Sequence, residues 1–270
     1  MNRKERRKLG LETVELLERG HYEIDGETIS FAGALREAVS QTCEYTNREG
    51  SPSFRVSTPL ETRVEVENEG SLSAARRLEG QGHRVAVLNF ASAKNPGGGF
   101  LNGSRAQEES LAMSSGLYAC LVDREMYEFH RPTRGGMYTP WVIYSPGVPV
   151  IRDTAGALLR APFEVAFITS PAPNAGAALK RDPSLGSELR RQLKIRIDKV
   201  LSVAAHHGHD ALVLGAWGCG VFKNDPSEVS ELFQSALLGR FSGAFSKVVF
   251  AVLDHSEERR FIGPFEARFA

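Results

Sequence analysis

Three consecutive glycines and a nearby pair of glutamates are the part of this 270-residue chain best suited to do chemistry. The run Gly97–Gly99 is followed by seven residues and then by Gln107, Glu108 and Glu109. Glycine lets the main chain approach a ligand closely and adopt positive φ. Two carboxylates beside such a loop can supply a general acid and hydrogen-bond acceptors for sugar hydroxyls. The pattern predicts a site that hydrolyses a glycosidic bond.

Both features also have a purely structural interpretation. A run of glycines can be a bare turn, and glutamates are common in the first turn of a helix because of the helix dipole. One glycine would suffice for a turn, however, and three cost backbone entropy on folding. Neither a P-loop lysine nor a G-x-G-x-x-G fingerprint accompanies the glycines. Since neighbouring helical residues point about a hundred degrees apart, Glu108 and Glu109 would have different roles.

The surrounding sequence predicts an α/β fold that positions this site. Helical patterns alternate with apolar runs of strand length, as expected where helices cover both faces of a sheet. The predicted strands are Arg84–Phe90, Val142–Tyr144, Val165–Thr169, Ala211–Leu214 and Lys247–Leu253. We therefore expect a three-layer α/β/α sandwich that binds ligands beyond the carboxyl ends of its strands. Both glycine-rich segments of the chain begin at such an end.

We expect one domain, with residues 1–60 as an N-terminal accessory extension and residues 61–270 as the core. The extension contains a charged helix over about 5–18, a hairpin-like YEIDGETISF and a helix over about 32–45. A loop rich in Ser, Pro and Thr (46–59) separates it from the core. One further helix is expected to begin near Glu108 and to carry Leu111, Tyr118 and Leu121 on one face.

Composition argues against several classes of protein. Lys plus Arg (33) equal Asp plus Glu (33), so the chain has no overall field for a nucleic acid or an anionic membrane. No apolar run reaches membrane-spanning length. Three widely spaced cysteines fit a reducing compartment. We expect a cytoplasmic protein, a monomer, with no membrane or direct nucleic-acid partner. The cluster of His206, His207 and His209 is expected to be a solvated helix end rather than a metal site.

The glycine and glutamate motif resembles the signature of poly(ADP-ribose) glycohydrolases. The wider segment VLNFASAKNPGGGFLNGSRAQEESL is similar to the bacterial-type branch of that family, as are NEGSLSAARRL, GAWGCGVF and VVFAVLDHSEERRFIGPF. The resemblance implies a macrodomain fold with a mixed central sheet. It also implies hydrolysis of ribose–ribose O-glycosidic bonds in poly(ADP-ribose), mainly from chain ends, with no cofactor or metal. The N-terminal extension would close over the terminal ribose, and ADP-ribosylated proteins would be partners.

The resemblance also assigns roles to residues. Glu109 falls on the catalytic acid/base, Glu108 would hold ribose hydroxyls, and Gln107 would support them. The glycines expected near the ribose and diphosphate are Gly97, Gly98 and Gly99. Many macrodomains have an asparagine three residues after the position of Asn89, where this chain has Ser92. We expect Glu109 to be protonated at neutral pH, because burial, Glu108 and the substrate diphosphate outweigh the helix dipole.

The second glycine-rich segment, Gly215–Phe222, follows the strand ALVL. Consecutive main-chain N–H groups there would suit diphosphate oxygens, although a tight connection with Phe222 in the core is the structural alternative. The predicted binding residues of this loop are Gly218, Cys219, Gly220, Val221 and Phe222. A nucleophilic Cys219 is not favoured, because the glutamates already explain the chemistry, and Lys223 is expected to be solvated. Phe261 is the candidate for stacking on adenine, with a core position as the alternative.

Two other functions fit parts of this pattern. A macrodomain that only binds ADP-ribose would keep both glycine loops but would not need the glutamate pair. A hydrolase that removes single ADP-ribose units from proteins would share the fold without requiring the carboxylates at this spacing. Release of free ADP-ribose from the polymer separates the three.

Overall fold

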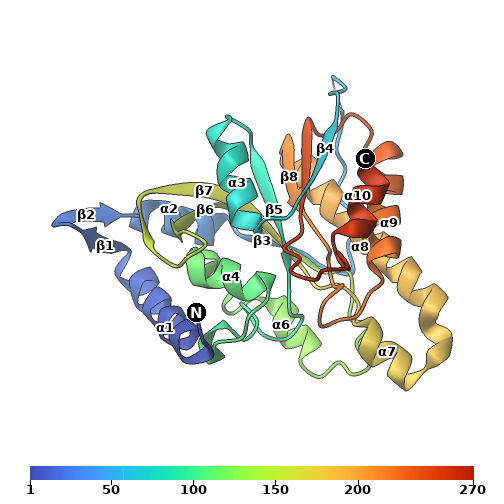
Figure 1. The fold of residues 1–270 in the computed structure, drawn as a ribbon, viewed down its shortest axis with the longest axis horizontal. Helices are drawn as coiled ribbons and strands as arrows, with labels where there is room; N and C mark the ends of the chain where they lie inside the picture. The colour runs from blue at the N-terminus through green and yellow to red at the C-terminus, as the bar shows by residue number, and fades with distance from the viewer. Residues whose placement is uncertain (57) are drawn as a thin grey trace.

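The computed structural model describes residues 1–56 and 58–270, and a seven-stranded mixed sheet runs through its centre (Figure 1). The strand order is β3-β6-β7-β5-β8-β9-β4. The five strands from β7 to β4 pair in parallel, whereas β6 is antiparallel to both of its neighbours. The strands are β3 (Cys43–Tyr45), β4 (Arg63–Glu67), β5 (Val85–Phe90), β6 (Val142–Arg152), β7 (Leu158–Ser170), β8 (Ala211–Leu214) and β9 (Lys247–Ala251).

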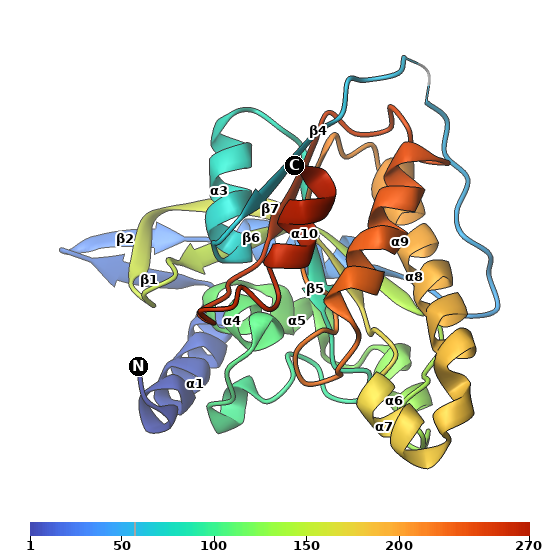
Figure 2. The same ribbon diagram turned by 45° about the vertical axis from the view of Figure 1, so that its right-hand side comes forward.

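Helices cover both faces of the sheet, which confirms the predicted three-layer sandwich with a mixed sheet (Figures 1 and 2). On one face lie α3 (Ser71–Gly80), α4 (Gln107–Ser114), α5 (Leu117–Leu121) and α6 (Glu125–His130). On the other lie α8 (Gly186–His206), α9 (Pro226–Leu238) and α10 (Gly263–Phe269), and α7 (Ala175–Arg181) precedes α8. Among the described residues, no helix is long and apolar enough to cross a membrane.

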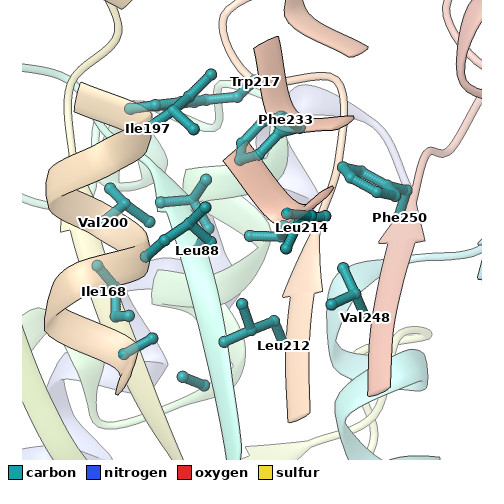
Figure 3. Packing of buried hydrophobic residues seen from close by; sticks show 14 of the residues in the cluster. Leu88, Ile168, Ile197, Val200, Leu212, Leu214, Trp217, Phe233, Val248 and Phe250 are labelled. Carbon is teal, nitrogen blue, oxygen red and sulfur yellow. The ribbon is translucent and has the colours of Figure 1, made fainter. Parts of the chain in front are cut away.

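Alternate residues of the strands build two separate cores. Leu88 and Leu212 face α8 and α9, where they pack with Ile197 and Phe233 (Figure 3). The intervening strand residues, among them Val87, pack under α3, α4 and α5. The strands are apolar on both faces because both faces are covered, which is why the sequence shows them as continuous runs.

The N-terminal extension contributes more to the sheet than the sequence suggested. After α1 (Arg3–Arg19) and the hairpin β1 (His21–Ile24) and β2 (Glu27–Ser30), helix α2 spans Ala32–Gln41 and does not reach Tyr45. Thr42 takes an extended conformation, its hydroxyl donates to Ala38 O (2.7 Å), and the chain continues as β3 along β6. This edge strand attaches the extension to the core. Of the predicted loop over 46–59, Ser57 lies outside the described residues.

The helix predicted to carry Leu111, Tyr118 and Leu121 is two helices. Helix α4 ends at Ser114, because Ser115 is extended and pairs with Val150 at the edge of β6. The Gly116 N–H then donates to Pro149 O (2.8 Å), and α5 begins at Leu117. Pairing with the long β6–β7 hairpin therefore overrides the helical pattern and shortens the element that carries the glutamates.

The prediction of a solvated helix end holds for His206, the exposed last residue of α8, but it is wrong for His207 and His209. His209 is buried, accepts the Tyr144 hydroxyl at Nε2 (2.8 Å) and has Nδ1 3.1 Å from Arg84 O. The His207 ring stacks on Tyr144 with centroids 3.6 Å apart. Burial lowers the pKa of both imidazoles to about 4. The Tyr144 ring fills the space that solvent would otherwise occupy.

This arrangement predicts acid destabilisation through His209. Its ordinary pKa is 6.5 and its folded value is about 4, so the unfolded chain binds protons more readily in that window and stability falls as pH drops through it. The unfolding free energy of the wild type should fall between pH 7 and pH 5. We expect this fall to be smaller by about 1–2 kcal/mol in His209→Gln. Urea titrations at both pH values measure it. The exposed His255 gives a matched control, His255→Gln, which should keep the wild-type slope. An unchanged slope in His209→Gln would contradict the assignment.

Candidate active site

The two glycine-rich loops meet at one edge of the sheet. Strands β5 and β8 are parallel neighbours, with Val87 opposite Val213, so both loops leave from adjacent carboxyl ends. A Cβ placed on Gly215 would lie 3.0 Å from the Phe90 ring and 2.6 Å from Ala251 O. The start of the second loop therefore lies against the end of β5. This is the edge at which α/β sheets bind ligands.

Gln107 fixes the first turn of α4 to the end of β5. Its Nε2 donates to Leu88 O (2.7 Å) and to the Ser71 hydroxyl (3.1 Å), and its Oε1 accepts the Phe90 N–H (2.9 Å). The Gln107 side chain thus takes the hydrogen-bonding positions that a neighbouring strand would occupy, at the point where β5 ends. It sets the position of the two glutamates that follow it.

Glu108 and Glu109 are each held by one oxygen. The Ser92 N–H donates to Glu108 Oε2 (2.7 Å), and the Gly99 N–H donates to Glu109 Oε1 (2.9 Å). The other oxygens, Glu108 Oε1 and Glu109 Oε2, are buried and have no hydrogen-bond partner among the described residues. Buried carboxylate oxygens are normally paired. Two unpaired acceptors on successive residues are thus suited to the hydroxyls of a sugar.

Gly98 is the point at which both carboxylates meet the loop. Its φ is +61°, and a Cβ there would lie 2.5 Å from Glu109 Oε1 and 3.0 Å from Glu108 Oε2. A side chain is therefore excluded both by the left-handed backbone and by the carboxylates. The glycine run allows the main chain to lie directly on the glutamate pair, rather than merely to turn.

Ser92, where many macrodomains have asparagine, contributes through its main chain. Its N–H holds Glu108, and its hydroxyl accepts the N–H groups of Lys94 (3.2 Å) and Asn95 (3.1 Å). The serine thereby shapes the start of the loop. Asn89 is fully buried, donates to the Thr169 hydroxyl (3.2 Å) and leaves its Oδ1 unpaired.

Burial raises the pKa of Glu108 well above its ordinary value, and the charge of Glu109 adds to the rise. The Ser92 and Gly97 N–H groups and the Asn89 amide oppose it. The sequence predicts the retained proton on Glu109, whereas the carboxyl group whose pKa burial raises is that of Glu108.

The second loop offers main-chain donors. The buried Trp217 anchors it, donating from Nε1 to Ser170 O (3.2 Å). Gly218 has φ +72°, and a Cβ there would lie 2.4 Å from the Asn224 amide, which donates to Pro173 O (2.9 Å) and Gly218 O (3.1 Å). Within residues 218–222, all of them described, four N–H groups find no acceptor: those of Gly218, Gly220, Val221 and Phe222. Such a row suits an anion.

The side chains of this loop are placed differently from one another. Val221 is 81% exposed, Phe222 is half-buried beside Tyr138 (centroids 6.3 Å apart), and Lys223 is exposed. Cys219 is buried, and burial raises the pKa of its thiol. Its Sγ lies 3.7 Å from Trp217 O. A protonated, enclosed thiol is not a nucleophile, so Cys219 can contribute only as part of the loop.

A cleft with a volume of about 880 Å³ adjoins the site. Gln107, Gly220, Phe90 and Phe261 line it, while the two glutamates lie next to it rather than on its wall. Phe261 is half-buried, with the Arg260 guanidinium 5.4 Å from its ring centroid and its N–H donating to Asp254 Oδ2 (2.7 Å). An aromatic face is thus available at this end of the cleft.

Sequence reasoning did not identify Phe90, Tyr138 or Asn224 as site residues. Phe90 reads as the last apolar residue of a strand, and Tyr138 lies in a loop without a motif. Asn224 follows the second glycine segment directly, so its position was the one available signal. No three His, Cys, Asp or Glu side chains in residues 1–56 and 58–270 come together as a metal site.

Comparison with known proteins places this geometry in a family. Residues 11–153 match the family model of the microbial-type PARG catalytic domain. A crystal structure of poly(ADP-ribose) glycohydrolase from Thermomonospora curvata is 49% identical, covers 98% of this chain and 100% of its own, and superposes with a TM-score of 0.92. The same enzyme bound to the inhibitor ADP-HPD is also 49% identical over 98% and 100% of the two chains, with a TM-score of 0.90.

A more distant relative shows the same fold. Poly(ADP-ribose) glycohydrolase from Deinococcus radiodurans in complex with ADP-ribose is 41% identical, covers 89% of this chain and 98% of its own, and has a TM-score of 0.80. No curated protein matches the chain.

The contact at Gly98 predicts a large effect of one methyl group. We expect Gly98→Ala to lower the free energy of unfolding by about 1–3 kcal/mol, because the alanine would be strained at positive φ and would press on Glu109. Chemical denaturation measures the change. Gly33 of α2 has nothing within 4 Å of a built Cβ, so the control Gly33→Ala should be neutral or stabilising. Equal stability of Gly98→Ala and the wild type would contradict the contact.

Proposed function

Because this chain belongs to the microbial-type poly(ADP-ribose) glycohydrolase family, we propose that it hydrolyses the ribose–ribose O-glycosidic bonds of poly(ADP-ribose) and releases ADP-ribose. The observation that carries the proposal is the buried glutamate pair, in which each carboxylate has one fixed and one free oxygen. A module that only binds ADP-ribose would have no need of this costly arrangement.

The cleft suggests how the terminal unit is held. Adenine would lie against Phe261, the diphosphate would accept the free N–H groups over 218–222, and the terminal ribose would contact Glu108 and Glu109. Phe261, Gly220 and Gln107, one residue from each of these three regions, line the same cleft. Phe222, half-buried at the end of the second loop, would pack beside this ribose. Gly97–Gly99 would lie over the ribose and diphosphate.

Glu109 is proposed to act first as acid and then as base. It would give its proton to the departing 2′-oxygen while the C1″–O bond breaks, leaving an oxocarbenium-like ribose. Water would then attack C1″ and return a proton to Glu109. Glu108 would accept hydrogen bonds from ribose hydroxyls through its free Oε1. A proton on Glu109 before this step is part of the proposal, and the raised pKa of Glu108 limits the negative charge next to it.

Cleavage mainly from chain ends is supported by the position of α1. Arg6 and Leu9 of that helix line the cleft together with Ser110 of α4. The helix is tied to the catalytic loop, because Arg3 Nε donates to Asn102 O (3.0 Å) and Arg6 Nε to Gly103 O (3.0 Å). We propose that α1 closes this end of the cleft, so that the next unit of an internal segment would meet the helix.

The setting of the reaction is also a proposal. We propose a monomeric, cytoplasmic enzyme that reverses ADP-ribosylation on modified proteins, including those marked in the DNA damage response. Three free cysteines, two of them buried, support a reducing compartment.

The acid/base assignment predicts that Glu109→Gln separates binding from turnover. The amide keeps the shape of the carboxyl but cannot transfer the proton, so release of ADP-ribose from the polymer should fall by at least about a thousandfold. Affinity for ADP-ribose, measured by calorimetry, should change less than about threefold. The exposed Glu79 of α3 provides the control Glu79→Gln, which should behave as the wild type. Substantial hydrolysis by Glu109→Gln would refute the assignment.

Stacking by Phe261 predicts a separate loss of affinity. We expect Phe261→Ala to weaken ADP-ribose binding about tenfold or more, since base stacking on an aromatic ring contributes on the order of 1–3 kcal/mol. Ribose 5-phosphate, which lacks adenine, should bind the variant and the wild type equally. A lower unfolding temperature with unchanged ADP-ribose affinity would assign Phe261 to the core instead.

A further inference from the structure

Basic residues are concentrated in four segments that form or adjoin the two loops of the site. The segments 91–106, 131–139 and 175–181 each contain two Lys or Arg, and 215–224 contains one, with no Asp or Glu in any of them. The whole chain has a formal net charge of zero, so this is a local excess. We call five of these basic residues, together with one tyrosine, the leaving-group rim: Arg131, Arg134, Lys180, Arg181, Lys223 and Tyr138.

The rim is attached to both catalytic loops. Lys94 Nζ donates to Arg131 O (3.1 Å) and Thr133 O (2.7 Å), which joins 131–139 to the start of the glycine loop. The Asn174 N–H donates to Gly136 O (2.8 Å), which joins the same segment to α7. The Gly176 N–H in turn donates to Phe222 O (3.0 Å) in the second loop. Both views show α6 and α7 near each other on this side of the molecule (Figures 1 and 2).

A buried arginine fixes the segment 131–139 through hydrogen bonds. Arg196 of α8 is fully buried and donates to Met137 O (2.6 Å), Pro171 O (3.1 Å) and Gln192 O (2.9 Å). The next residue, Tyr138, is half-buried and has φ +48°, an uncommon conformation for a bulky side chain. Its ring lies 6.3 Å from that of Phe222. The backbone thus fixes an aromatic ring beside the second loop.

The cationic side chains of the rim have no polar partner within the part of the protein that the structure describes. In the part of the chain that the structure describes, the side chains of Arg131, Arg134, Lys180, Arg181 and Lys223 make no ion pair and no hydrogen bond. The acids nearest to Arg181 and Lys223 along the chain cap helix starts, since Asp182 accepts the Ser184 N–H and Asp225 the Ser227 N–H. Glu128, three residues before Arg131, is exposed. Unpaired charge of one sign next to a reaction site favours an anionic ligand.

We propose that this rim binds the leaving group, namely the adenosine and diphosphate of the penultimate polymer unit. The inference rests on the proposed function, in which the bond to the 2′-oxygen of that adenosine breaks at Glu109. The terminal unit occupies the cleft toward Phe261, so the penultimate unit leaves on the other side, past Phe222 and Tyr138. Tyr138 presents a ring to its adenine, and Arg134, Arg181 and Lys223 surround its diphosphate.

The double variant Arg134→Gln/Arg181→Gln tests the rim, with ADP-ribose release from polymer as the readout. We expect KM for the polymer to rise about tenfold at low salt, from two lost charge contacts, with kcat and ADP-ribose affinity unchanged. Arg134→Lys should keep the wild-type KM because it keeps the charge. The unpaired, exposed Arg36 and Arg63 give the control Arg36→Gln/Arg63→Gln, which should match the wild type.

A short substrate separates the rim from the catalytic claim. Adenosine joined through its 2′-oxygen to one ADP-ribose lacks the second diphosphate, so its KM should be equal for the wild type and the double variant. An unchanged polymer KM in the double variant, or an equal rise for the short substrate, overturns the rim. A wild-type protein that releases no ADP-ribose from either substrate overturns the proposed function instead.

Discussion

The main chain fixes the buried glutamate pair through one hydrogen bond to each carboxylate, and the geometry of the site follows from these two bonds. The Ser92 and Gly99 N–H groups each fix one oxygen of Glu108 or Glu109 and leave the other without a partner. For this to happen the loop must lie on the glutamates, which is why Gly98 can carry no side chain. The glutamates must also be fixed relative to the strand, which Gln107 achieves through its contacts with the end of β5.

Main-chain N–H groups and charged side chains are proposed to bind different phosphate groups of the substrate. The diphosphate is proposed to meet N–H groups over 218–222, which are anchored by the buried Trp217 and by Asn224. Unlike lysine or arginine side chains, such donors lose no side-chain entropy on binding. The cations lie farther out, where a second phosphate group would be needed to use them. This arrangement is consistent with a chain of zero net charge whose substrate is a polyanion.

Much of the fold was predictable, because the strands are buried on both faces and read as continuous apolar runs. The glycine and glutamate motif also identified the residues that the structure brings together at the ends of β5 and β8. The predictions that failed depended on contacts between residues far apart in the sequence. Helix α2 gives way to β3 because β6 offers a free edge, and α4 ends early because Ser115 pairs with Val150. The burial of His209 depends on Tyr144, which is 65 residues away in the sequence. Phe90 gave no signal of its own.

A crystal structure of the protein with ADP-ribose bound would test the role of the glutamate pair. We expect the unpaired Oε2 of Glu109 to lie within hydrogen-bond distance of the anomeric oxygen of the terminal ribose. Glu108 Oε1 should contact a neighbouring hydroxyl of the same ring, with both main-chain bonds to the carboxylates retained. A complex in which the ribose contacts neither free oxygen would contradict the account.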